Sequence, residues 1–117
     1  MELTVLERLV VQALLPKEGN YTTLKLLRVC REALSFDDLE NKRLDFKQEG
    51  EGETAQVRWN EKVGDEIVKN IEFGEVMKLE IIASLKKLEE EKKLRDEHFT
   101  IYEKFVEKPK NTVELVT

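Results

Sequence analysis

The sequence predicts an α+β fold in a single domain, and three observations support that prediction. Apolar residues follow helical spacing early in the chain, alternate with polar residues in the middle, and return to helical spacing near the end. The chain has 117 residues, of which 40% are hydrophobic, and this length suits one domain. We expect three helices, a three-stranded antiparallel meander and two further helices over residues 1–108, followed by a tail over residues 109–117.

Helix signals open the chain. Thr4 and Glu7 have the spacing of a capping box, which predicts a first helix over residues 4–15 that ends before a proline. A second apolar stripe predicts a helix over residues 22–34. Ser35, with an acidic residue three positions later, is expected to be the N-cap of a short third helix.

The period then changes from helical to two. Alternating runs over residues 44–48 and 55–59 surround a glycine-containing tip and predict a β-hairpin. A third strand is expected over residues 67–73, reached through a loop. A long helix over residues 75–93 and a last helix that begins at Asp96 complete the pattern. Because three short strands leave open sheet edges, pairing with a second copy as a homodimer is a further expectation.

Charge and composition exclude several classes of protein. The formal net charge is -5, and residues 36–75 hold twelve acids against six bases, which argues against a general binder of phosphate backbones. A single cysteine cannot form an internal disulfide, which favours a reducing compartment. Neither a secretory signal nor a membrane-spanning apolar run is present, so we expect a cytoplasmic protein without membrane contact.

No arrangement of residues typical of catalysis is found. Cys30 lies on an apolar helical stripe and is expected to be a buried thiol, while His98 stands at a helix start with nothing nearby to activate. Ser35 and Ser84 lack the context of a nucleophile. We therefore expect no enzyme activity, no cofactor and no metal site, although abundant Glu leaves a carboxylate-only Mg²⁺ site open.

Nucleic-acid binding is disfavoured by the sign of the charges. Three helices before a hairpin suggest a winged helix, but the third helix would carry Asp37, Asp38 and Glu40 toward the phosphates. Bases on the second helix keep a regulator that binds nucleic acid open as an alternative. The acidic hairpin tip also leaves mimicry of DNA open.

Two zones are the predicted contact sites for a partner protein. One is the hairpin with its acidic tip, and the other is the last helix, because Trp and Tyr are frequent anchors of protein interfaces. The residues of these zones are Glu49, Glu51, Glu53, Arg58, Trp59, Tyr102 and Phe105. Replacing Arg58 by Glu is expected to weaken partner binding without unfolding the protein.

Six local signatures, taken together in their order, give a resemblance. They are Leu15-Pro16-Lys17-Glu18-Gly19, Leu44-Asp45-Phe46-Lys47, Trp59-Asn60, Phe73-Gly74-Glu75, Leu85-Lys86-Lys87-Leu88 and Tyr102-Glu103-Lys104-Phe105. With this set, residues 3–106 resemble a group of small, uncharacterised proteins of tailed bacteriophages and prophages. The resemblance implies a phage origin and a location in the host cytoplasm. It implies no activity and no functional residue, because the signatures are structural.

The leading functional hypothesis is a non-enzymatic, phage-encoded protein that binds a host or phage protein, for host takeover or against a defence system. A virion structural or assembly protein that acts as a homo-oligomer is the first alternative. The nucleic-acid regulator and a small metal-dependent enzyme are the others.

Overall fold

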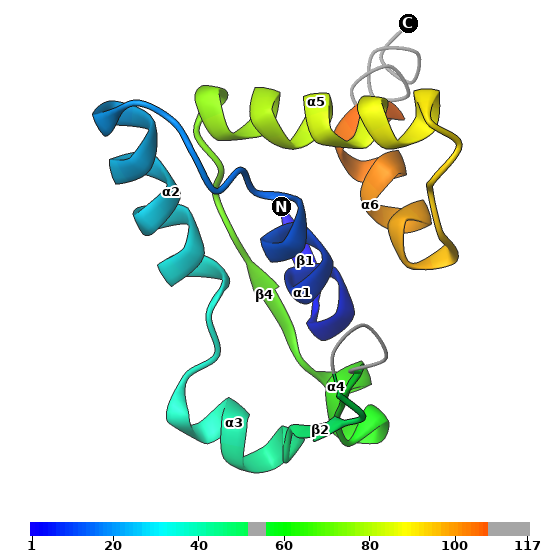
Figure 1. Cartoon of the computed structure of the whole chain (residues 1–117). Helices are drawn as coiled ribbons and strands as arrows, with labels where there is room; N and C mark the ends of the chain where they lie inside the picture. The colour runs from blue at the N-terminus through cyan, green and yellow to red at the C-terminus, as the bar shows by residue number, and fades with distance from the viewer. Residues whose placement is uncertain (52–55, 108–117) are drawn as a thin grey trace, which may run out of the picture.

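The structure of the chain is a computed structural model that describes residues 1–51 and 56–107 (Figure 1). Glu53 and the predicted tail over residues 109–117 lie outside the described residues. The elements are β1 (Glu2–Thr4), α1 (Val5–Leu14), α2 (Tyr21–Leu34), α3 (Asp38–Leu44), β2 (Lys47–Glu49), β3 (Gln56–Arg58), α4 (Glu61–Glu66), β4 (Val68–Asn70), α5 (Glu75–Glu90), η2 (Asp96–His98), α6 (Phe99–Tyr102) and η3 (Glu103–Glu107).

The α+β class is confirmed, but the three-stranded meander is wrong. The described strands form two separate antiparallel pairs, β1 with β4 and β2 with β3. The predicted hairpin is present, with Lys47 opposite Arg58. The expected third strand does not join it, because Asn60 caps the short helix α4, which separates β3 from β4. Strand β4 instead pairs with the N-terminal residues, where Leu3 lies opposite Lys69.

The helix starts depend on caps that the sequence indicated only in part. The capping box of α1 is confirmed, with the Glu7 N–H 3.2 Å from Thr4 Oγ1 and the Thr4 N–H 3.0 Å from Glu7 Oε1. The prediction for Ser35 is wrong, because Ser35 ends α2 and Asp37 is the N-cap of α3. Asn20 caps α2, so this helix begins slightly earlier than expected.

The chain reverses direction after α5 through a Schellman motif. Lys92 adopts the left-handed conformation with φ 56°, and the Lys93 N–H donates to the Leu88 carbonyl at 2.8 Å. The predicted last helix is then divided into a 3₁₀ turn (η2), the α-helical turn α6 and a π-helical turn (η3). This reversal brings α6 back against α1 and beneath α5 (Figure 1).

Helix α1 is the centre of the fold. It contacts α2, α4, α5 and α6, and it lies beside β4 in Figure 1. The main core joins α1 and α2 to α5 and α6, with Leu34, Ile81, Leu85 and Ile101 fully buried. A second, smaller cluster lies at the other end of α1, where Val5 packs with residues of α3 and α4. Helix α1 therefore connects two apolar clusters that burial stabilises.

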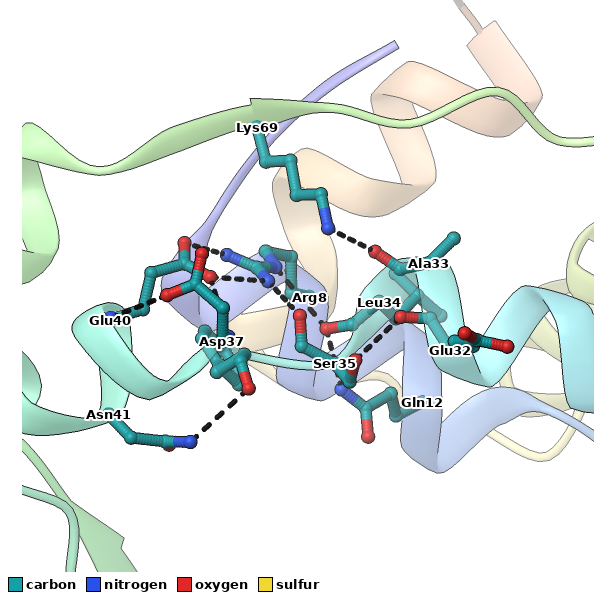
Figure 2. Close-up of polar contacts among 11 residues, drawn as sticks. Arg8, Gln12, Glu32, Ala33, Leu34, Ser35, Asp37, Glu40, Asn41 and Lys69 are labelled. Atoms are coloured by element: carbon teal, nitrogen blue, oxygen red, sulfur yellow. Dashed lines mark hydrogen bonds and ion pairs between the residues drawn. The ribbon is translucent and has the colours of Figure 1, made fainter.

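Arg8 is the residue that ties α1 to the end of α2 and to α3 (Figure 2). Its side chain is 0% exposed, which is rare for a cation unless it is paired. The guanidinium donates to the carbonyls of Leu34 and Ser35, and its Nη1 lies 2.7 Å from Glu40 Oε2. Its carbon Cζ also stands 4.0 Å from the centre of the Phe36 ring. Every nitrogen of this buried guanidinium thus has a hydrogen-bond acceptor.

The carbonyls at the C-terminal end of α2 receive three side chains from other elements. Besides Arg8, Gln12 Nε2 donates to the Leu34 carbonyl at 3.1 Å, and Lys69 Nζ donates to the Ala33 carbonyl at 2.9 Å (Figure 2). Cations at this position complement the negative end of the helix dipole. The end of α2 is therefore held by α1 on one side and by β4 on the other.

Two carboxyl groups have lowered pKa values in the folded chain. The hydrogen bond from Arg8 holds the pKa of Glu40 below its ordinary value of 4.5. Burial by itself would raise the pKa of Glu7, but hydrogen bonds from Lys104 and from the Thr4 N–H outweigh burial and lower it. Both carboxylates therefore stabilise the folded state in their charged form.

Replacing Arg8 by Ala should lower the free energy of unfolding by about 3–5 kcal/mol, because the carboxylate of Glu40 and the carbonyls at the end of α2 lose their partner. Urea unfolding measures the change. Replacing Arg43 by Ala is the control, since its ion pair with Glu66, at 3.2 Å, is exposed and is worth at most about 1 kcal/mol. Equal losses in the two variants would contradict the central role of Arg8.

Stability should fall in acid through Glu7 and Glu40. Their lowered pKa values mean that the unfolded chain binds protons first, so their contribution is complete above pH 4.5 and disappears as the pH falls through the folded pKa values. Urea unfolding from about pH 6 to about pH 3 measures this slope. The double variant Glu7→Gln, Glu40→Gln should show a flatter profile, and an unchanged slope would contradict the assignment.

Candidate functional site

The turn between α5 and α6 stands at the meeting point of three surface hollows. Arg95 and His98 line a hollow of about 540 Å³ against α1 and the hairpin, and one of about 920 Å³ against the ends of α1 and α5. They also line a third hollow, of about 360 Å³, against α6. No other described residue lines all three of these hollows.

The geometry of this turn is fixed by its own backbone and by one imidazole. The Arg95 N–H donates to His98 Nδ1 at 2.9 Å, and the His98 N–H donates back to the Arg95 carbonyl at 2.9 Å. Since Nδ1 is an acceptor here, the neutral ring carries its proton on Nε2. Among residues 1–51 and 56–107, the Arg95 guanidinium makes only a long contact of 4.0 Å with Glu97, and its side chain is 79% exposed.

The hairpin forms one side of this site. Val57 and Trp59 line the hollow that Arg95 and His98 close from the other side. The Trp59 ring packs 6.1 Å from the ring of Phe46, which anchors the half-buried indole to the small core cluster. Trp59 is half-buried and also lines this hollow, so it has the mixed character that is common at protein interfaces.

Helix α6 forms the other side. Phe99 is 66% exposed next to Leu94, and Tyr102 lines the same hollow. The Tyr102 hydroxyl donates to the carboxylate of Glu89, and this hydrogen bond raises the pKa of the tyrosine. Because Glu89 belongs to α5, the contact fixes α6 against α5. The result is an exposed Phe99 beside a half-buried Tyr102 that is held against α5.

The structure therefore joins parts of both predicted contact zones through the turn. We call this region the corner surface, and its residues are Val57, Trp59, Arg95, His98, Phe99 and Tyr102. Sequence reasoning missed Arg95, since nothing local shows which elements a turn will contact. Leu94 and Phe99, two apolar residues that flank a charged turn, were the available signal.

The other predicted contact residues are placed differently. Phe105 is 3% exposed and packs against Phe73 at 5.3 Å between ring centres, so it belongs to the core and we remove it from the contact residues. Glu49 and Arg58 pair across the hairpin at 2.7 Å, with both side chains largely exposed. Glu51 is exposed at the hairpin tip.

The nucleophilic side chains are engaged in structural contacts. Ser35 Oγ donates to the Glu32 carbonyl at 2.6 Å, and Ser84 Oγ donates to the Leu14 carbonyl at 3.0 Å. Burial raises the pKa of the Cys30 thiol, which disfavours the reactive thiolate. Within residues 1–51 and 56–107, no three His, Cys, Asp or Glu side chains are grouped so that they could hold a metal ion.

Comparisons with known proteins add nothing to this geometry. No family model matches the chain, and neither a curated protein nor a solved structure matches it. In the described part of the chain, no helix is both long and apolar enough to span a membrane.

The indole of Trp59 is held by a close approach to Gly64. A Cβ at residue 64 would lie 2.7 Å from Trp59 Nε1, which is closer than atoms tolerate. Gly64→Ala should therefore shift the indole N–H resonance in NMR and destabilise the fold by about 1–3 kcal/mol. Gly74→Ala is the control, because nothing lies within 4 Å of its added Cβ. An unchanged indole resonance in Gly64→Ala would contradict this packing.

Proposed function

We propose that the chain is a non-enzymatic interaction protein that binds another protein through the corner surface. One observation carries the proposal: the turn at Arg95 and His98 joins the hairpin and α6 into one surface with three adjoining hollows. Hollows lined by aromatic groups allow a partner to insert side chains and exclude water, which concentrates binding energy in a few contacts.

The chemistry of the corner surface supports this role. Trp, Tyr and Arg are the residues most enriched among energetic anchors of interfaces, and Trp59, Tyr102 and Arg95 supply one of each. The surface is also preorganised, because Phe46 packs against Trp59 and Glu89 binds Tyr102. A partner would then lose little entropy in ordering these side chains.

The engaged nucleophiles support a role without catalysis. The described serines donate to backbone carbonyls, and the thiol of Cys30 is buried in the core. His98 uses Nδ1 to hold the turn, so its role is positional. An activated nucleophile needs an adjacent base, and none of these side chains has that arrangement.

The resemblance to phage proteins gives this proposal its biological setting. In that setting the partner is a host or phage protein in the cytoplasm of an infected bacterium, and binding blocks or redirects that partner. The formal net charge of -5 favours a protein partner over a nucleic acid, because an acidic chain repels a phosphate backbone.

Capture of partners from bacterial lysate, followed by binding measurements with the isolated partner, tests the proposal. Phe99→Ala combined with Arg95→Glu should weaken binding tenfold or more, or about 1.4 kcal/mol, because both side chains are exposed anchors. Leu39→Ala on α3 is the matched control, since Leu39 is 67% exposed and Phe99 is 66% exposed. The control should bind like the wild-type protein.

Three outcomes would contradict the proposal. Equal binding by the wild-type protein and the double variant would place the interface elsewhere. Retention that disappears on nuclease treatment would favour the nucleic-acid regulator. Retention of virion proteins alone, from infected cells, would favour the assembly role.

A further inference from the structure

The outer edges of β1 and β4 differ in whether their backbone groups are hydrogen-bonded. The pattern of the ladder between the two strands shows which backbone groups point outward. Met1 and Ile71 exchange backbone hydrogen bonds of 2.8 and 3.0 Å. Bonded and non-bonded pairs alternate along an antiparallel ladder, so Leu3 and Lys69 form the next bonded pair. The backbone groups of Glu2 and Thr4 on β1, and of Val68 and Asn70 on β4, therefore point away from the ladder.

The outer edge of β1 is closed by two side chains. The Thr4 N–H donates to Glu7 Oε1 at 3.0 Å, and Lys104 Nζ donates to the Glu2 carbonyl at 2.8 Å. Lys104 and Glu7 also pair with each other at 2.7 Å. A carboxylate and an ammonium group thus take the places that the carbonyl and N–H of a neighbouring strand would occupy.

The outer edge of β4 has no such cover. No described residue hydrogen-bonds to the outward backbone groups of Val68 and Asn70. Val68 is 51% exposed, and Asn70 is also exposed. Burial alternates from Ile67 to Phe73, which shows that the extended segment is longer than β4 itself. An open edge of this kind is a template for another strand.

We infer that β4 is the site of a homodimer in which two copies pair antiparallel, edge to edge, about a twofold axis at Asn70. In this register the bonded pairs are Asn70 with Asn70 of the second copy, and Val68 with Glu72 of the second copy. The outward groups of residues 68, 70 and 72 then all find partners. This inference concerns a surface other than the corner surface and does not depend on it.

The charges along β4 allow a second copy to pair with the axis at Asn70. With the axis at Asn70, Lys69 faces Ile71 of the second copy and Glu72 faces Val68, so no like charges are opposite each other. With the axis at Lys69, the two lysines would face each other directly, and like charges in that position are destabilising. A second copy with the axis at Asn70 therefore avoids this repulsion.

A pair of variants at Val68 tests the register by sedimentation equilibrium over a range of concentrations. Val68→Glu would place a carboxylate opposite Glu72 of the second copy twice in each dimer, whereas Val68→Lys would place an ammonium group there. We expect the dimer dissociation constant of Val68→Glu to exceed that of Val68→Lys about tenfold or more. Within the monomer both side chains would lie opposite the uncharged Thr4, and urea unfolding of the two variants checks that both are folded.

Val68→Pro tests the edge itself. Proline removes an outward N–H and leaves the β1 ladder intact, and the φ of -94° and ψ of 113° at Ile67 suit a residue before proline. This variant should be a monomer with native circular dichroism. In the wild-type protein, the amide hydrogens of Val68 and Asn70 should exchange with solvent more slowly as the protein concentration rises. A monomeric wild-type protein up to about 1 mM would overturn the inference. Equal dissociation constants for the Glu and Lys variants, or protection of these amides independent of concentration, would also overturn it.

Discussion

The fold depends on one buried cation. Arg8 lies on the central helix with no exposed surface, and it satisfies two carbonyls at the end of α2 and the carboxylate of Glu40 on α3. A buried charge without these partners would cost several kcal/mol, so α1, α2 and α3 can adopt only the arrangement that supplies them. Apolar packing gives the clusters their stability, while Arg8 gives the three helices their relative positions.

The remaining elements follow from this arrangement. Once α1 is fixed, its apolar side organises the main core, and the Schellman turn at Lys92 returns the chain so that α6 packs against α1. The same return brings Lys104 to Glu7, which closes the edge of β1. The corner surface forms where this returning segment meets the hairpin. Its position is therefore a consequence of the polar contacts that hold α1.

Short-range patterns in the sequence correctly predicted the elements that depend on residues close together in the chain. The capping box at Thr4 and Glu7, the helix that carries Cys30 and the hairpin around residue 50 were all visible as short-range signals. The pairing of β4 with β1 was not visible in the sequence, because Leu3 and Lys69 are far apart along the chain. Arg8 gave no signal either, since a basic residue within an amphipathic helix has the pattern of an exposed position. Phe105 was misplaced for the opposite reason, because an aromatic residue fits a core or an interface equally well in sequence.

Polar side chains in this chain hydrogen-bond to backbone groups that would otherwise need a neighbouring strand or a further turn of helix. Glu7 and Lys104 replace a third strand at β1, and Arg8, Gln12 and Lys69 replace a further turn of helix at the end of α2. A chain of 117 residues has little apolar surface to bury, so directed hydrogen bonds determine which backbone groups are closed. Backbone groups without a hydrogen-bond partner are then informative. A strand edge that lacks partners, next to edges that have them, indicates where a strand of another chain can pair. The β4 edge is such a place, and it lies on a sheet that the protein's own contacts already hold in an extended conformation.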